Sequence, residues 1–193
     1  MMSLVHTESA IVPAPLQQSF AEVDAGAVHL PQWQSLALQI QHNLQYQHHW
    51  SDLHVHTHSP LTNEPLPRPL VSGLPPQRLY VHPDEQVELL KDADRKRKAN
   101  KAGGETGALQ VDVEPELEWV LPTRLNEKWS LRRLAEVFDA ISSVPPSSTA
   151  TVHQDPPKNP WRTTKRVLLG TVDSDSTVVY YFVHDGVVKP RQN

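Results

Sequence analysis

Three histidines in one short stretch, residues 50–58 (WSDLHVHTH), are the side chains of this sequence best suited to metal chemistry. His54, His56 and His58 alternate with apolar or small residues, so a β-strand would place the three imidazoles on one face. Two imidazoles at positions i and i+2 of a strand can chelate one metal ion. One hypothesis is therefore a metal site at His54 and His56.

The phrase at residues 52–57 (DLHVHT) resembles the opening metal-binding motif of the polymerase-and-histidinol-phosphatase metalloenzymes, which implies a metal-dependent phosphoesterase. That family needs further His and Asp ligands on a longer series of alternating strands and helices. The later histidines His82, His153 and His184 are isolated, and no such alternation follows. We expect an exposed histidine-rich strand without metal or cofactor, and the phosphoesterase remains the alternative.

A basic run, Arg95, Lys96, Arg97 and Lys98, lies in a charged and then glycine-rich segment at residues 91–107. Such a run can contact phosphate groups or serve as a nuclear import signal. A solvated insertion loop with neither role is the other interpretation.

The end of the chain, residues 165–193, predicts an antiparallel hairpin. Two runs rich in β-branched and aromatic residues flank the polar segment 173–176 (DSDS). The second run contains Val178, Val179, Tyr180, Tyr181, Phe182 and Val183, and a strand so apolar must be covered on both faces. Asp173 and Asp175 place two like charges close together at the tip, which is unfavourable for a plain turn. We interpret the hairpin as a docking element; a solvated hairpin with an incidental acidic turn is the alternative.

The elements that must position these residues follow from periodicity. The sequence predicts a helix over residues 31–47, strands over 50–58, 77–82 and 116–121, and a second helix that begins at Asn126 or Ser130 and ends near residue 142. Leu131, Leu134, Phe138 and Ile141 form the apolar stripe of that second helix. Residues 59–76 are proline-rich and predicted to be a loop. The expected fold class is α/β, with a mixed sheet packed on helices and closed by the terminal hairpin.

Composition limits the domain organisation and the function class. The 193 residues include 18 prolines and are 38% hydrophobic, which predicts one domain (30–193) after a flexible leader (1–29), with disordered insertions at about 91–110 and 143–160. There is no cysteine, hence no disulfide framework and no thiolate metal site. We expect no membrane span. The net charge of −4 argues against a protein that coats nucleic acid along its whole surface, so any RNA contact must be local or supplied by a partner.

Four stretches of the chain resemble the family of subunit 15 of the eukaryotic tRNA-splicing endonuclease, in its fungal form. They are residues 118–123 (EWVLPT), the predicted helix at 129–141, residues 172–181 (VDSDSTVVYY) and residues 184–186 (HDG). The resemblance covers residues 44–193 with insertions. It implies a tRNA-endonuclease-like fold and a nuclear heterotetramer of two catalytic and two structural subunits that cuts precursor tRNA, in which this chain pairs with the catalytic subunit of the 34 type. It also implies that the last strand pairs with its counterpart in that neighbour, and that Asp173 and Asp175 enter a basic pocket on a catalytic subunit.

The same resemblance bears on catalysis. Cleavage needs a base, an acid and a cation for the developing phosphorane charge, and catalytic relatives supply them with Tyr, His and Lys. Lys165 lies about where their lysine does, and a basic residue that merely starts a strand is the alternative. Tyr80 could be an unused counterpart of their tyrosine, or simply a core or half-buried aromatic residue. Their histidine precedes the strand predicted at 116–121, yet residues 103–119 contain no histidine. We therefore expect a non-catalytic subunit. A homodimeric RNA-binding adaptor, working through Arg95 to Lys98 and the terminal strand, is a further alternative.

Overall fold

A computed structural model of the chain describes residues 32–101, 111, 113–147 and 159–187. The predicted leader at 1–29 lies outside the described residues, as do residues 102–110 and 148–158 of the two predicted insertions. The division of the chain into leader, domain and insertions stays a prediction.

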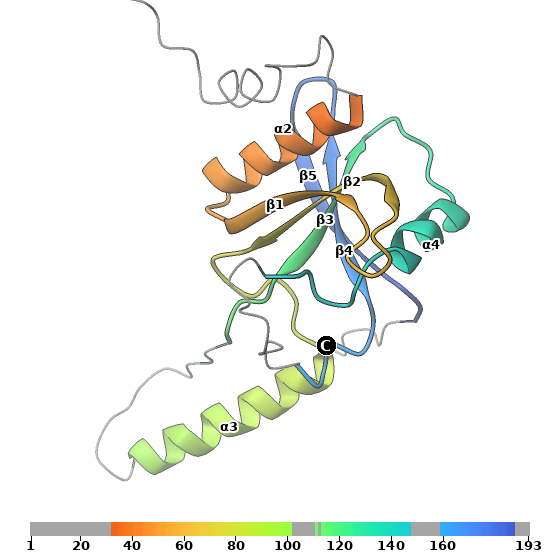
Figure 1. The fold of residues 1–193 in the computed structure, drawn as a ribbon. Helices are drawn as coiled ribbons and strands as arrows, with labels where there is room; N and C mark the ends of the chain where they lie inside the picture. The colour runs from red at the N-terminus through yellow and green to blue at the C-terminus, as the bar shows by residue number, and fades with distance from the viewer. Residues whose placement is uncertain (1–31, 102–110, 112, 148–158, 188–193) are drawn as a thin grey trace, which may run out of the picture.

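The centre of the fold is a five-stranded sheet in the order β1-β2-β3-β4-β5 (Figure 1). The strands are β1 (Ser51–His58), β2 (Pro65–Leu74), β3 (Glu118–Arg124), β4 (Arg166–Val172) and β5 (Val178–His184). β3 and β4 run parallel, whereas the other neighbouring pairs are antiparallel. The predicted α/β class, with a mixed sheet and a C-terminal antiparallel hairpin, is confirmed.

Helix α2 (Gln32–Tyr46) covers one face of the sheet, as its apolar stripe predicted. The stripe is buried in a first core, whose buried members are Leu36, Ala37, Ile40, Leu44, Trp50, Val71, Val120, Leu168 and Val172. Burial of these side chains is the main stabilising term for this half of the domain.

Helix α4 (Leu131–Asp139) covers the opposite face and is capped by Ser130, whose hydroxyl accepts a hydrogen bond from the Arg133 N–H at 3.3 Å. The second core contains Leu66, Leu70, Trp119, Leu121, Val137, Phe138, Ile141 and Val167. Successive β3 residues alternate between the two cores because successive strand side chains point to opposite faces. Placing Leu131 in the buried stripe was wrong: its side chain is 86% exposed at the start of the helix.

Strand β2 corrects the prediction of a loop at residues 59–76. Its prolines lie at positions 65, 67 and 69, and β2 pairs with β3 only at 71–73. The proline half therefore has no β3 neighbour and behaves as a strand edge, where a missing N–H costs no ladder bond. Likewise, β3 continues through Pro122 to Arg124, beyond the predicted stop, because pairing with β2 has already ended at Val120.

Two further predictions were wrong next to this sheet. Residues 77–82 form no strand and connect β2 to helix α3 (Pro83–Lys101). That helix includes residues 91–101, which were predicted to be loop. Pro83 at its first position and Asp84 and Glu85 in its first turn favour helix initiation. Among the described residues, no helix is long and apolar enough to cross a membrane.

Candidate functional site

The terminal hairpin forms one border of the sheet. All residues of β4 have partners in β5, from Arg166 opposite His184 to Val172 opposite Val178. Among the described residues β5 pairs with β4 alone, so its outer backbone groups have no ladder partner there. Such an edge is a template for pairing with another chain.

The hairpin tip is held by its own acidic side chains. The Asp173 carboxylate accepts hydrogen bonds from the Ser174 N–H at 2.6 Å and the Ser174 hydroxyl at 3.2 Å, and Asp175 accepts from the Thr177 N–H at 2.8 Å. Hydrogen bonds from the backbone and the side chain of Thr177 lower the pKa of Asp175. The argument that two acids are a poor choice for a turn was therefore incomplete, since both stabilise this one locally. Both aspartates nevertheless remain exposed.

The two faces of β5 differ in burial. Val178, Tyr180 and Phe182 pack against the first core, and the Tyr180 hydroxyl donates to Asn43 in α2 at 2.7 Å. Burial raises the pKa of Tyr180. On the opposite face, Val183 packs against the second core, but Val179 and Tyr181 are 42% and 56% exposed. Of the six strand residues predicted to bind a partner, Val179 and Tyr181 present the most free surface; the partner role of all six stays a prediction.

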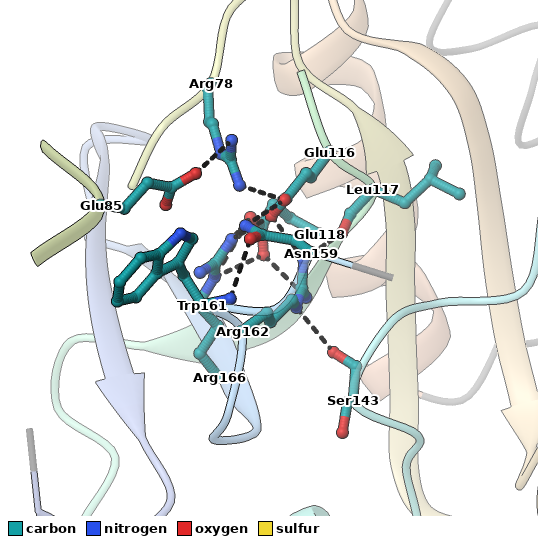
Figure 2. Close-up of polar contacts among 10 residues, drawn as sticks. All are labelled: Arg78, Glu85, Glu116, Leu117, Glu118, Ser143, Asn159, Trp161, Arg162 and Arg166. Atoms are coloured by element: carbon teal, nitrogen blue, oxygen red, sulfur yellow. Dashed lines mark hydrogen bonds and ion pairs between the residues drawn. The ribbon is translucent and has the colours of Figure 1, made fainter. Parts of the chain in front are cut away.

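A second charged feature lies at the other end of the hairpin. Six side chains, which we call the arginine–glutamate network, meet where parallel strands β3 and β4 begin: Arg78, Glu85, Glu116, Glu118, Arg162 and Arg166 (Figure 2). Glu118 is the first residue of β3 and Arg166 the first of β4, so parallel pairing brings the two together. The network holds three positive and three negative side chains.

The network is buried and well paired. Arg162 contacts Glu116 at 3.3 Å and Glu118 at 3.2 Å, Arg166 contacts Glu116 at 2.9 Å and also pairs with Glu118, and the Glu118 side chain is 1% exposed. Burial lowers the pKa of Arg162. Burial also acts to lower the pKa of Arg166, but hydrogen bonds and charge from Glu118 outweigh it, so that this pKa is raised. Each charge thus depends on its partners, because an unpaired buried charge is strongly unfavourable.

A cavity of about 40 Å³ adjoins the network, with Tyr80, His82, Trp161 and His184 in its lining. The Tyr80 ring lies 4.9 Å from the His184 ring, and the Arg166 guanidinium lies 5.1 Å from the Tyr80 ring centre. Burial, with the charges of Arg166 and Arg162, lowers the pKa of His184. Its Nδ1 is buried without a hydrogen-bond partner among the described residues, and the cavity has room for a water molecule.

Lys165 does not face this group. Its ammonium donates to the Phe138 carbonyl at 2.6 Å, at the end of α4. The cation beside Tyr80 is instead Arg166, which sequence reasoning missed together with Arg162, Glu116 and Glu118. A signal was present: one glutamate precedes and a second starts the apolar strand β3, two positions apart, and arginines likewise precede and start β4.

The three histidines of β1 each contact a different polar side chain. His54 Nε2 lies 2.9 Å from the Asp52 carboxylate, His56 Nε2 lies 2.8 Å from the Ser72 hydroxyl with its ring against Trp119, and His58 Nδ1 lies 3.0 Å from the Thr57 hydroxyl. Within the described part of the chain, no group of three His, Cys, Asp or Glu residues is arranged to hold a metal ion. The geometry gives the metal hypothesis no support.

The basic run Arg95, Lys96, Arg97 and Lys98 lies on α3 with exposed side chains. Arg95 pairs with Asp92, and both Arg97 and Lys98 pair with Asp94. The run therefore lies on a helix and not in the loop that the sequence predicted.

Comparison with known proteins completes the description. The sequence model of the family described as "Sen15 protein" matches residues 39–193. The chain is 44% identical over 164 residues to the "Probable tRNA-splicing endonuclease subunit tsp-1" of Neurospora crassa, a match that covers 83% of this chain and 66% of that protein.

Two further relatives are more distant. A "Probable tRNA-splicing endonuclease subunit sen15" of Schizosaccharomyces pombe is 36% identical over 83 residues, covering 42% of this chain and 53% of that protein. The "tRNA-splicing endonuclease subunit SEN15" of Eremothecium gossypii is 32% identical over 112 residues, covering 57% of this chain and 77% of that protein. The chain thus spans between about half and three quarters of the length of these relatives.

Proposed function

This chain belongs to the Sen15 protein family, and from that membership we propose that it is a non-catalytic structural subunit of the tRNA-splicing endonuclease, the complex that cleaves precursor tRNA at the intron splice sites. The observation that carries the proposal is the family match over residues 39–193, which includes the whole sheet and the terminal hairpin. The names of the relatives, all tRNA-splicing endonuclease subunits, support it.

The proposed partners are the other subunits of a heterotetramer, first among them the catalytic subunit of the 34 type. The edge of β5 would continue into a strand of that subunit, with Val179 and Tyr181 covered by it. Asp173 and Asp175 would enter a basic pocket on a catalytic subunit. The exposure of all four side chains, and the absence of a second ladder for β5 among the described residues, support this arrangement.

The absence of activity in this subunit is part of the proposal. Residues 103–119, where catalytic relatives are expected to carry their histidine, contain none, and Glu116 within this stretch is paired with Arg162 and Arg166. The Lys165 ammonium is bound to the Phe138 carbonyl, away from Tyr80. A salt-bridged carboxylate and buried arginines are poorly suited to the acid–base work of RNA cleavage, because an ionised carboxylate has no proton to donate and is a weak base, and arginine is effectively always protonated.

We place the protein in the nucleus, where the resemblance locates the complex. The exposed basic run on α3 supports this, since import receptors recognise such runs. Fluorescence imaging of the tagged full chain tests it, and exclusion from the nucleus would contradict it.

Assembly is tested by co-expressing the tagged full chain with the remaining endonuclease subunits and measuring the mass of the purified complex. We expect a heterotetramer that cleaves intron-containing precursor tRNA, and an isolated chain that does not cleave it. A chain that purifies alone in the presence of all subunits would overturn the structural role. Cleavage by the isolated chain would overturn the non-catalytic assignment.

The same preparation separates the alternatives. Mass measurement of the isolated chain shows whether β5 pairs with a second copy, as a homodimer would require. If that homodimer persists and binds RNA when the other subunits are present, the adaptor hypothesis replaces the proposal. Stoichiometric divalent metal that is lost on replacing His54 and His56 would favour the phosphoesterase.

A further inference from the structure

Positive charge in this protein is concentrated on the second half of α3. Residues 91–101 contain six basic and two acidic side chains, a net charge of +4 within a chain whose total is −4. The rest of the chain is therefore acidic and repels nucleic acid. A polyanion that binds this protein should bind here.

The helix carries this charge away from the acidic domain. Figure 1 shows α3 leading away from the sheet, and its first turn is anchored by Glu85, which pairs with Arg78 at 3.0 Å. With a rise of 1.5 Å per residue, Arg95 lies about 15 Å along the axis from Glu85. This is about twice the Debye length of ~8 Å at physiological ionic strength, so the charges of the domain hardly cancel those of the helix end.

Helical spacing sorts the basic side chains by direction. Lys91, Arg95 and Lys98 follow one another at i, i+4 and i+7, and therefore share one face; we call them the basic stripe. Their side chains are 62%, 78% and 73% exposed. Lys96 and Arg97, although adjacent in sequence, point to other sides of the helix because each residue advances by about 100°.

Phosphate groups can replace the acidic partners of the basic stripe with little loss of free energy. Lys91 pairs with Glu88 at 3.5 Å, Arg95 with Asp92 at 3.0 Å and Lys98 with Asp94 at 2.7 Å, all on the helix surface. Exposed pairs of this kind contribute little, because water screens them and ordering long side chains costs entropy. A row of phosphates would bind the same cations and also release counterions.

We propose that the basic stripe of α3, Lys91, Arg95 and Lys98, binds the RNA phosphate backbone and so guides precursor tRNA along the endonuclease. The proposal rests on the proposed function for its choice of RNA. It predicts that the contribution of each basic residue to RNA affinity depends on its position on the helix and not on the number of charges in the run.

Two double variants of the full chain test this in the assembled complex. Arg95→Gln/Lys98→Gln removes two stripe charges, and Lys96→Gln/Arg97→Gln removes two charges from the same run outside the stripe. Glutamine resembles lysine and arginine in helix propensity, so α3 should persist in both, as circular dichroism can check. The probe is a labelled precursor tRNA transcript with 2′-deoxy nucleotides at the splice sites, which removes the attacking hydroxyl and prevents cleavage.

The stripe variant should bind this probe about tenfold more weakly at 50 mM salt, and its slope of log affinity against log salt should fall by roughly 1.4 to 1.8, the value for two lost phosphate contacts. The control variant should lose less than about twofold. Equal losses in both variants, or no loss in either, would overturn the proposal. Equal loss of nuclear accumulation with unchanged RNA affinity would assign the run to import instead, and would also overturn it.

Failure of assembly is a separate result. If the wild-type chain does not join the complex, the proposed function fails, and the same comparison is then made with the full chain alone and the same probe. A stripe-specific loss there would still support the inference.

Discussion

Glu118 is the most deeply buried acid of the arginine–glutamate network. Its carboxylate is 1% exposed and contacts both Arg162 and Arg166. Replacing one member of a buried ion pair is more harmful than replacing an exposed one, because the remaining charge is left in a medium that solvates it poorly.

The variant Glu118→Gln should therefore lower the free energy of unfolding by about 3 to 5 kcal/mol, since two buried guanidinium groups each lose one of their two carboxylate partners. Glu136→Gln is the control, because Glu136 pairs with Arg132 on the exposed surface of α4. That change should cost about 0 to 0.5 kcal/mol. Urea unfolding of both variants measures the difference, and a cost for Glu118→Gln as small as the control would contradict the importance of the network.

His56 makes stability depend on pH. Burial and the neighbouring His54 lower its pKa in the folded protein, while in the unfolded chain it stays near 6.5. Just below pH 6.5 the unfolded state therefore takes up a proton that the folded state does not, so the stabilising contribution is present above pH 6.5 and is lost as pH falls through the folded pKa.

We expect His56→Gln to reduce the loss of stability between about pH 7 and pH 5, measured by urea unfolding at several pH values. Part of the loss should remain, because the pKa of His184 is lowered as well. An unchanged pH profile in His56→Gln would count against this account.

At the level of elements, the two aspartates of the hairpin tip stabilise the turn by accepting hydrogen bonds and are also proposed to dock by their charge. A double substitution can separate these two roles. Asp173→Asn/Asp175→Asn keeps an oxygen that can accept the turn hydrogen bonds but removes both charges. If the charges dock into a basic pocket, the variant should fold with nearly wild-type stability, yet its complex should form more weakly and lose much of its sensitivity to salt. Co-purification of the subunits at increasing salt measures this.

The matched control for the tip is Glu136→Gln/Asp139→Asn, which removes two exposed acidic charges on α4, away from the hairpin tip. It should assemble as the wild type does. If both double variants behave alike, the tip has no special docking role.

The exposed face of β5 can be tested with a pair of matched tyrosines. Tyr181 is 56% exposed on this strand, and Tyr46 is 53% exposed at the end of α2. Tyr181→Lys should weaken binding of the catalytic partner by about 2 kcal/mol, roughly thirtyfold, because buried interface tyrosines often contribute this much. Tyr46→Lys should not change it. Titration of the isolated chain with the partner subunit measures both, and equal affinities would rule out β5 as the interface.

The sequence predicted the helices that have a regular apolar stripe or a clear capping residue. It failed for β2, which depends on strand pairing, and for α3, which lacks an apolar stripe. The stripe of α2 and the capped start of α4 could be predicted because the signals are local. β2 was missed because its three prolines are tolerated only through the lack of a β3 neighbour at that end, a fact of topology. α3 was missed because it has no sustained apolar stripe and depends on its initiation signals and charge pairs.

On the scale of the whole molecule, the sheet unites two cores on opposite faces, with α2 on one and α4 on the other. The candidate site is likewise split between the two ends of the terminal hairpin. The acidic tip could be predicted from sequence because its residues are contiguous. The arginine–glutamate network could not, because it joins residues from positions 78 to 166 that come from β3, β4, α3 and the segments that precede them and meet only in the folded chain.

That parallel pairing also has a consequence for the order of folding events. Val120 and Leu168 are partners although 48 positions separate them, so this step must close a long loop, whereas the hairpin of β4 and β5 needs only a short one. Hairpins form in about 1 to 10 μs, while domains rich in distant contacts complete folding in milliseconds to seconds. A newly made chain should therefore pass through a period in which the apolar β4–β5 hairpin has formed but the rest of the sheet has not yet covered it. Synthesis alongside a partner that captures this hairpin early should raise the yield of native protein and reduce aggregation.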